Sequence, residues 1–170
     1  MHQHGNEIYP SNIRKTNEEI LNNVSLLINY FIEKQYIISK LELFAGDLFY
    51  DNLFFDLIEI IYNYYNFINI NKLLESSKII IPCNMSFCKY DDKIEKVKTL
   101  ISRFKDINVD LIFSYSTDGL YGINTREKEN LTEQDFDKIL SLCHTYGWTV
   151  HPMISPENID NAYKNYDWWK

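Results

Sequence analysis

Apolar side chains recur along the chain with two different spacings, and the longer spacing predicts helices. Residues 16–36 open with Thr16-Asn17-Glu18-Glu19, a capping box in which the threonine and the second glutamate satisfy orphan backbone donors. The same periodicity predicts helices over residues 51–68, 91–104 and 132–146, and Ser155-Pro156 predicts the start of a fifth. The inward face of the first helix is expected to carry Ile20, Val24, Leu27, Ile28 and Phe31.

Shorter apolar runs lie between these helices and predict strands over residues 40–44, 78–82, 109–114 and 148–151. Strands that alternate with helices form a parallel sheet with helical crossovers, so the predicted fold class is α/β. The alternation begins with a helix, as if a first strand were missing. Two architectures fit the pattern: an open doubly wound sheet and a piece of a β/α barrel.

Composition limits the functions that this sequence supports. The 170 residues are 45% hydrophobic and 24% charged, which is typical of one globular domain over residues 1–170. A net charge of −7 argues against nucleic-acid partners and anionic membrane surfaces, which attract Lys and Arg. The sequence has neither a long apolar run nor a signal peptide, so we expect no membrane association and a cytoplasmic location. Its three cysteines predict reduced thiols rather than a disulfide framework.

Small and polar residues follow each predicted strand, where parallel α/β folds bind their ligands. This pattern is typical of a ligand-binding rim, although ordinary loops are polar too. The four strand ends carry Ala45, Gly46 and Asp47; Cys83, Asn84 and Met85; Ser114, Ser116 and Asp118; and His151 with the residues up to Ser155.

Several of these residues have side chains suited to a charged, polyol-bearing ligand. Asp47 suits an ammonium group, and it would equally serve as the cap of the following helix. Ser114, Ser116 and Asp118 place three oxygens near one strand end, which suits a ribose or another polyol, although Asp118 can also form a turn. Arg126 has the donor geometry to hold a carboxylate, or it is simply solvated.

Three segments together resemble the radical S-adenosylmethionine enzymes. Residues 41–47, followed by 51–55, resemble the second strand and Gly-Gly-Glu motif of that family. Residues 113–119, followed by Asn124-Thr125-Arg126, resemble its fourth-strand Ser-x-Asp-Gly…Arg segment. Residues 153–159 resemble its fifth strand and the helix after it. The resemblance covers about residues 16–168.

This resemblance implies an incomplete parallel β/α barrel (a partial TIM-type barrel) with helices on the outside, which binds S-adenosylmethionine beside a [4Fe-4S] cluster. Residues 45–47, with Asp47, would meet the methionine amino group, and Arg126 would meet the carboxylate. Ser116 would lie near the ribose, and His151 would line the pocket. The complete family enzyme forms a 5′-deoxyadenosyl radical that abstracts hydrogen from a substrate, here unknown, with a peptide or protein among the candidates.

The chain departs from the family at the cluster. Cys83 and Cys88 follow the wrong strand and lack the family's Cys-x3-Cys-x2-Cys spacing, so no cluster ligands are assigned here. We expect the first strand and the cluster loop to lie upstream of Met1. Ala45 and Asp47 also replace the family's Gly and Glu. Whether this chain alone is an enzyme is therefore open, and the alternative is a cluster-less, non-catalytic α/β binding or interaction protein on the same scaffold.

Overall fold

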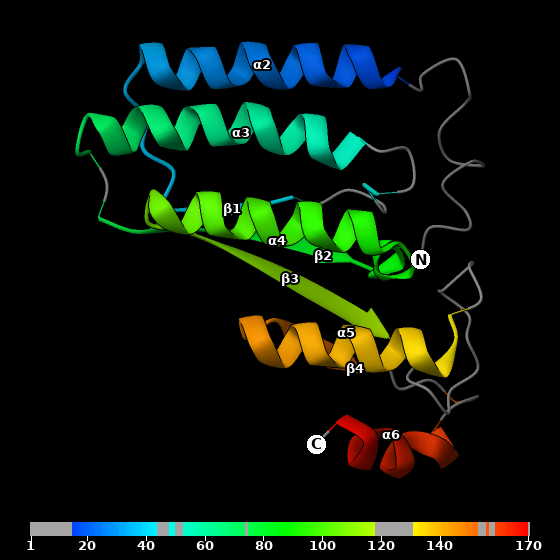
Figure 1. Cartoon of the computed structure of the whole chain (residues 1–170). Helices are drawn as coiled ribbons and strands as arrows, with labels where there is room; N and C mark the ends of the chain where they lie inside the picture. Colours follow the sequence, from blue (N-terminus) through cyan, green and yellow to red (C-terminus); the bar gives the residue numbers. More distant parts are fainter. Residues whose placement is uncertain are drawn as a thin grey trace. The chain divides into compact units, whose positions relative to one another are not determined.

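The structure is a computed structural model that describes residues 15–43, 48–49, 53–73, 75–117, 131–152, 156 and 159–169. The predicted alternation of helices and strands is confirmed in this part of the chain (Figure 1). The elements are α2 (Asn17–Glu33), β1 (Lys40–Glu42), α3 (Leu53–Ile70), β2 (Ser77–Cys83), the 3₁₀ helix η2 (Ser86–Lys89), α4 (Asp91–Asp106), β3 (Val109–Thr117), α5 (Glu133–Tyr146), β4 (Thr149–Pro152), the 3₁₀ helix η3 (Ile159–Asn161) and α6 (Ala162–Trp169).

The chain divides into two compact units. The first comprises residues 1–38 and 48–75, and its described elements are α2 and α3. The second comprises residues 39–47 and 76–170 and contains all four strands with α4, α5 and α6.

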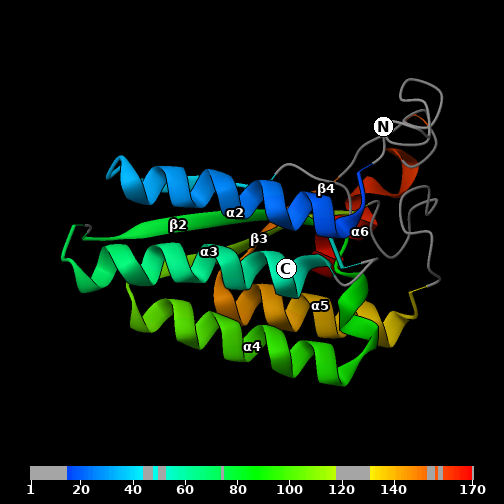
Figure 2. The same ribbon diagram turned by 90° about the horizontal axis from the view of Figure 1, so that it is seen from above.

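In the first unit, α2 and α3 pack side by side and run in the same direction, as Figures 1 and 2 both show. The capping box predicted at the start of α2 is confirmed, because Thr16 Oγ1 accepts from the Glu19 N–H and Glu19 accepts from the Thr16 N–H. Ile28 is buried as predicted, but Leu27 is 51% exposed, so its predicted inward position is wrong. The two residues are neighbours near the edge of the apolar stripe, and the helical period alone does not decide which one is covered.

The second unit contains a parallel sheet in the order β1-β2-β3-β4. Neighbours in the sheet are therefore neighbours in the sequence, and the order does not reverse among these four strands. Right-handed crossovers between consecutive strands place their helices on one face of a sheet. α4 and α5 do lie on the same face in Figures 1 and 2, and an ion pair between Lys138 and Asp91 joins them.

The two faces of the sheet differ in burial. Along β2 and β3 every second residue is buried, and these residues form the apolar layer on the side of α4 and α5. The ring of Phe113, for example, lies 5.6 Å from that of Phe87 and 4.5 Å from that of Trp148. The residues between them, such as Ile112 and Ser114, are half-buried on the opposite face. This opposite face carries the candidate site.

Two predicted boundaries differ from the structure. β1 ends at Glu42, and the predicted strand end at Phe44 lies outside the described residues. The fifth helix was expected from Ser155-Pro156, but Pro156 lies in a turn and α6 begins only at Ala162. That prediction is wrong because a Ser-Pro pair also initiates turns. Among the described residues, no helix combines the length and the apolar character needed to cross a membrane.

Candidate functional site

Three of the predicted site residues fall on described strands. Ser114 and Ser116 lie in the carboxyl half of β3, and His151 lies in β4. Residues 45–47, Asp118 and Arg126 lie outside the described residues. The contacts expected for the amino and carboxylate groups of the ligand therefore stay predictions. The residues of the predicted polyol site on β3 and β4 lie in the described part of the chain.

The strand register brings the three residues together. Ser116 pairs with His151, and Ser114 pairs with Thr149. Paired residues of neighbouring strands point to the same face, with the strands about 4.8 Å apart, and residues two positions apart along a strand share that face too. Ser114, Ser116, Thr149 and His151 thus form one polar patch, on the face opposite α4 and α5.

The four side chains of this polar patch carry hydrogen-bonding groups. Ser114 and Ser116 are half-buried, whereas Thr149 and His151 are exposed. Within the described part of the chain, no residue hydrogen-bonds to any of these four side chains. Each hydroxyl can donate one hydrogen bond and accept two, and an imidazole can do both. The patch is therefore equipped to bind a ligand that carries several hydroxyl groups.

The turn after β2 lies beside the patch and is held in a defined conformation. Cys83, the last residue of β2, pairs with Tyr115, which directly precedes Ser116. Met85 then adopts left-handed backbone angles of φ 61° and ψ 20° with its side chain buried, and its N–H donates to Cys83 Sγ at 3.1 Å. A non-glycine residue in this region costs free energy and is enriched at functional sites.

Asn84 presents a donor group in this turn. Its Oδ1 accepts from the Ser86 N–H at 2.9 Å, which fixes the plane of the side-chain amide. The Nδ2 group has no partner among the described residues, and the side chain is half-buried. Asn84 therefore offers two oriented donors at the carboxyl end of β2, one strand away from Ser116.

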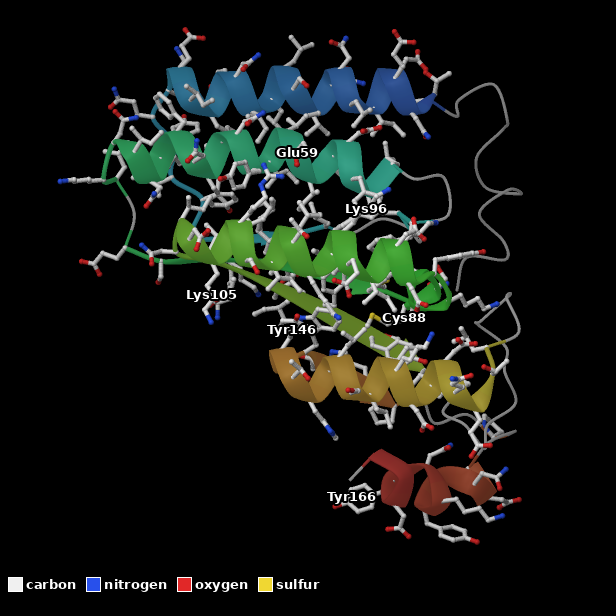
Figure 3. The ribbon with its side chains drawn as sticks, in the orientation of Figure 1. Glu59, Cys88, Lys96, Lys105, Tyr146 and Tyr166 are labelled. Carbon is white, nitrogen blue, oxygen red and sulfur yellow. The ribbon has the colours of Figure 1, made fainter. Side chains whose placement is uncertain are left out.

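The cysteines do not fit the iron–sulfur cluster that the resemblance implies. All three are buried free thiols. Burial raises the pKa of the Cys88 thiol far above its ordinary value, and the charges of Cys143 and Asp135 raise it further. Burial also raises the pKa of Cys143 to about 11. Figure 3 shows the Cys88 sulfur between the start of α4 and α5, on the apolar side of the sheet. Cluster ligands are thiolates, which this surrounding disfavours.

No group of three or more His, Cys, Asp or Glu side chains with the geometry to hold a metal ion occurs among the described residues. The polar patch contains only one such residue, His151. The side chains of the polar patch are suited to hydrogen bonding with an organic ligand.

Comparison with known proteins finds no family model, no curated protein and no solved structure that matches this chain. The candidate site therefore rests on its own geometry. The sequence analysis did not select Thr149, because it considered only polar residues at the ends of the predicted strands, where His151 lies. The alternation of a strand would have shown that Thr149 and His151 share a face.

Proposed function

We propose that this chain binds S-adenosylmethionine at the carboxyl ends of β3 and β4. The observation that carries the proposal is the placement of Ser114, Ser116 and His151 on one face, in register, without hydrogen-bond partners in the described part of the chain. A ribose has two adjacent hydroxyls, each able to donate and accept. Paired side chains on neighbouring strands suit such a diol, because they offer matching groups at a short, fixed spacing.

The strand order supports the scaffold that this proposal needs. A β/α barrel joins its strands in consecutive order, with all helices outside, and the order β1-β2-β3-β4 has that form. Barrel enzymes bind ligands at the carboxyl ends of their strands, which is where the polar patch lies. We therefore propose a partial barrel of the radical S-adenosylmethionine type as the architecture.

The proposal is limited to binding of the ligand. Radical cleavage of S-adenosylmethionine requires three thiolates for the cluster, and the buried thiols at positions 83, 88 and 143 do not supply them. The raised pKa values of Cys88 and Cys143 favour the second candidate function, a cluster-less binding protein on the same scaffold.

Titration calorimetry tests the binding proposal. We expect the wild-type chain to bind S-adenosylmethionine weakly and adenosine more weakly still, whereas methionine alone should give no heat from this patch. Ser116→Ala and His151→Ala should each weaken binding about 2–10-fold, the effect of losing one neutral hydrogen bond. His144→Ala, an exposed histidine on α5, is the matched control and should bind like the wild type.

Two results would overturn the proposal. The first is an absence of heat with S-adenosylmethionine at millimolar concentration. The second is equal binding by the wild type and by the double variant of Ser116 and His151, which would place the ligand elsewhere.

A further inference from the structure

Asn84 lies on the same face of the sheet as the polar patch. Cys83 pairs with Tyr115, so the residues that follow them, Asn84 and Ser116, lie side by side on neighbouring strand ends, about 4.8 Å apart. The alternating burial of β2 continues to Asn84, because Cys83 is buried on the side of the helices while Pro82 and Asn84 are half-buried. Asn84 therefore extends the row of polar side chains from β3 and β4 onto β2.

The amide of Asn84 presents donors to a ligand. Its Oδ1 accepts from the Ser86 N–H at 2.9 Å, so this oxygen is used within the turn. The two groups of an amide diverge from one carbon, and Nδ2 therefore points away from Ser86. Nδ2 has no hydrogen-bond partner among the described residues. A group that only accepts hydrogen bonds is the best match for such a donor, and a carboxylate is the group of this kind with the highest charge.

The buried residue Met85 holds the turn on which the amide depends. Its side chain is 0% exposed, and its N–H donates to Cys83 Sγ at 3.1 Å. Phe87 and Cys88, in the 3₁₀ helix that follows, are buried as well. An amide supported in this way is already in its binding orientation, so a ligand that meets it loses less conformational entropy on binding.

The chemistry of S-adenosylmethionine decides which part of the ligand meets Asn84. The ribose hydroxyls both donate and accept, the ammonium group only donates, and the carboxylate only accepts. With the ribose between Ser116 and His151, the ligand must span the two strand spacings from His151 to Asn84, roughly 10 Å, to reach the amide. The amino-acid part of S-adenosylmethionine is an extended, flexible chain that ends in the carboxylate and suits this span.

We propose that Asn84 binds the carboxylate of S-adenosylmethionine through Nδ2 while the ribose lies on the polar patch. This inference rests on the proposed function and deepens it, because it gives the ligand a direction across the sheet. The ribose lies over β3 and β4, and the amino-acid part lies over the end of β2. The resemblance implies Arg126 for the same carboxylate, and a carboxylate has enough acceptor sites for both side chains.

Titration calorimetry with three ligands tests this assignment: S-adenosylmethionine, its decarboxylated form, which lacks only the carboxylate, and adenosine. Asn84→Ala should bind S-adenosylmethionine about tenfold more weakly, the effect of losing a hydrogen bond to a charged group, and should bind the other two ligands like the wild type. Ser116→Ala should weaken the binding of all three ligands alike, because its contact is with the ribose. Asn22→Ala, at an exposed position on α2, is the matched control and should change none of them.

Asn84→Asp separates contact with the ligand from support of the turn. An aspartate still offers an oxygen to the Ser86 N–H, but it replaces the two donors by an acceptor and adds a negative charge. We expect this variant to bind S-adenosylmethionine more weakly than Asn84→Ala does, and to bind the decarboxylated form at least as tightly as the wild type does. Circular dichroism and thermal melting of each variant show whether the fold is retained.

Three results would contradict the inference. Equal weakening of all three ligands by Asn84→Ala would show that the residue only supports the turn, and S-adenosylmethionine binding itself would stand. Weaker binding of adenosine by Asn84→Ala, with no added effect on S-adenosylmethionine, would place the adenine base at Asn84 instead of the carboxylate. A wild type that binds none of the three ligands would overturn the proposed function, and this inference with it.

Discussion

The side chain of Tyr64 on α3 anchors the segment after α2 through the backbone of Tyr36. The Tyr64 hydroxyl donates to the Tyr36 carbonyl at 2.6 Å and accepts from the Ile38 N–H at 3.0 Å. The neighbouring Tyr65 donates to the Ile38 carbonyl at 3.0 Å. Both rings are buried, with 1% of each residue exposed. The carboxyl-terminal cap of α2 is Lys34 and not a glycine. The three hydrogen bonds satisfy backbone groups of the segment that follows this helix.

Replacement of Tyr64 by phenylalanine should destabilise the first unit. The ring would still pack, but the Ile38 N–H and the Tyr36 carbonyl would lose their partner, at a cost of about 1–3 kcal/mol. For a chain of this size we expect the melting temperature to fall by several degrees. Tyr65→Phe removes one hydrogen bond and should cost less, and Tyr163→Phe, at an exposed position, should cost nothing measurable. Calorimetry of the three variants and the wild type measures these melting temperatures. Equal melting temperatures of Tyr64→Phe and the wild type would contradict the prediction.

Ionisation of the Tyr64 hydroxyl should make the stability of the chain depend on pH in the alkaline range. Burial raises the pKa of Tyr64 above its ordinary value of 10.0, and the hydrogen bond from Ile38 only partly opposes this. Below about pH 10 neither the folded nor the unfolded chain ionises this tyrosine, so its stabilising contribution is complete. Above that pH the unfolded chain releases the proton first, and the contribution is lost as the pH rises through the folded-state pKa. Urea unfolding between pH 8 and pH 11 should show the advantage of wild type over Tyr64→Phe shrinking above pH 10. A constant difference would contradict this.

The sequence predicted most of the fold because its periodic segments are long. α4 shows this clearly: Ile94, Val97, Leu100 and Phe104 were expected inward and are buried. Both architectures that the pattern allowed have parallel strands, and the sequence did not contain the strand order β1-β2-β3-β4. That order depends on which strand pairs with which, a tertiary property that local periodicity does not report.

The site could be predicted only in part. Ser114, Ser116 and His151 were predicted as candidate site residues because polar residues near the ends of apolar strands stand out in the sequence. That Ser116 pairs with His151 and Ser114 with Thr149 depends on the register, which no local pattern fixes. Asn84 was noticed as a residue of the rim, but its fixed amide depends on the left-handed Met85, and no sequence rule places a methionine in that conformation.

The start of α5 predicts a loss of stability in acid. Asp135 Oδ2 accepts from the Thr132 N–H at 2.9 Å and from the Thr132 hydroxyl at 2.7 Å, and these bonds lower the pKa of Asp135 below its ordinary value of 3.8. The contribution is therefore present above that pH and is lost as the pH falls through the folded-state pKa. Asp135→Asn should cost about 0.5–1 kcal/mol at neutral pH and progressively less below pH 4. Asp137→Asn, on the same helix, is the control. A larger effect at pH 3 than at pH 7 would refute the assignment.

The thiols should be unreactive in the folded chain. Cys83, Cys88 and Cys143 are all buried, and the thiolate is the reactive form of cysteine. With the pKa of Cys143 at about 11 and that of Cys88 higher still, the thiolate fraction at pH 8 is very small. A thiol reagent at pH 8 should label the native chain slowly and all three cysteines at once after unfolding in guanidinium. Rapid labelling of one cysteine in the native chain, located by mass spectrometry, would show that its surroundings open.

Anaerobic reconstitution with iron and sulfide should leave this chain without a [4Fe-4S] cluster. A cluster needs three or four thiolates that converge on one site. No group of three or more His, Cys, Asp or Glu side chains in the described part of the chain has the geometry to hold a metal ion, and all three thiols are buried. Deprotonation of Cys88 and Cys143 would place charge in an apolar interior, and this burial is why their pKa values are raised. We expect well under one iron per chain, unchanged in Cys88→Ser and Cys143→Ser, because any remaining iron would be bound nonspecifically. About four irons and four sulfides per chain, lost in either variant, would show that the thiols converge in solution, and the cluster-bearing function would then replace simple binding of S-adenosylmethionine.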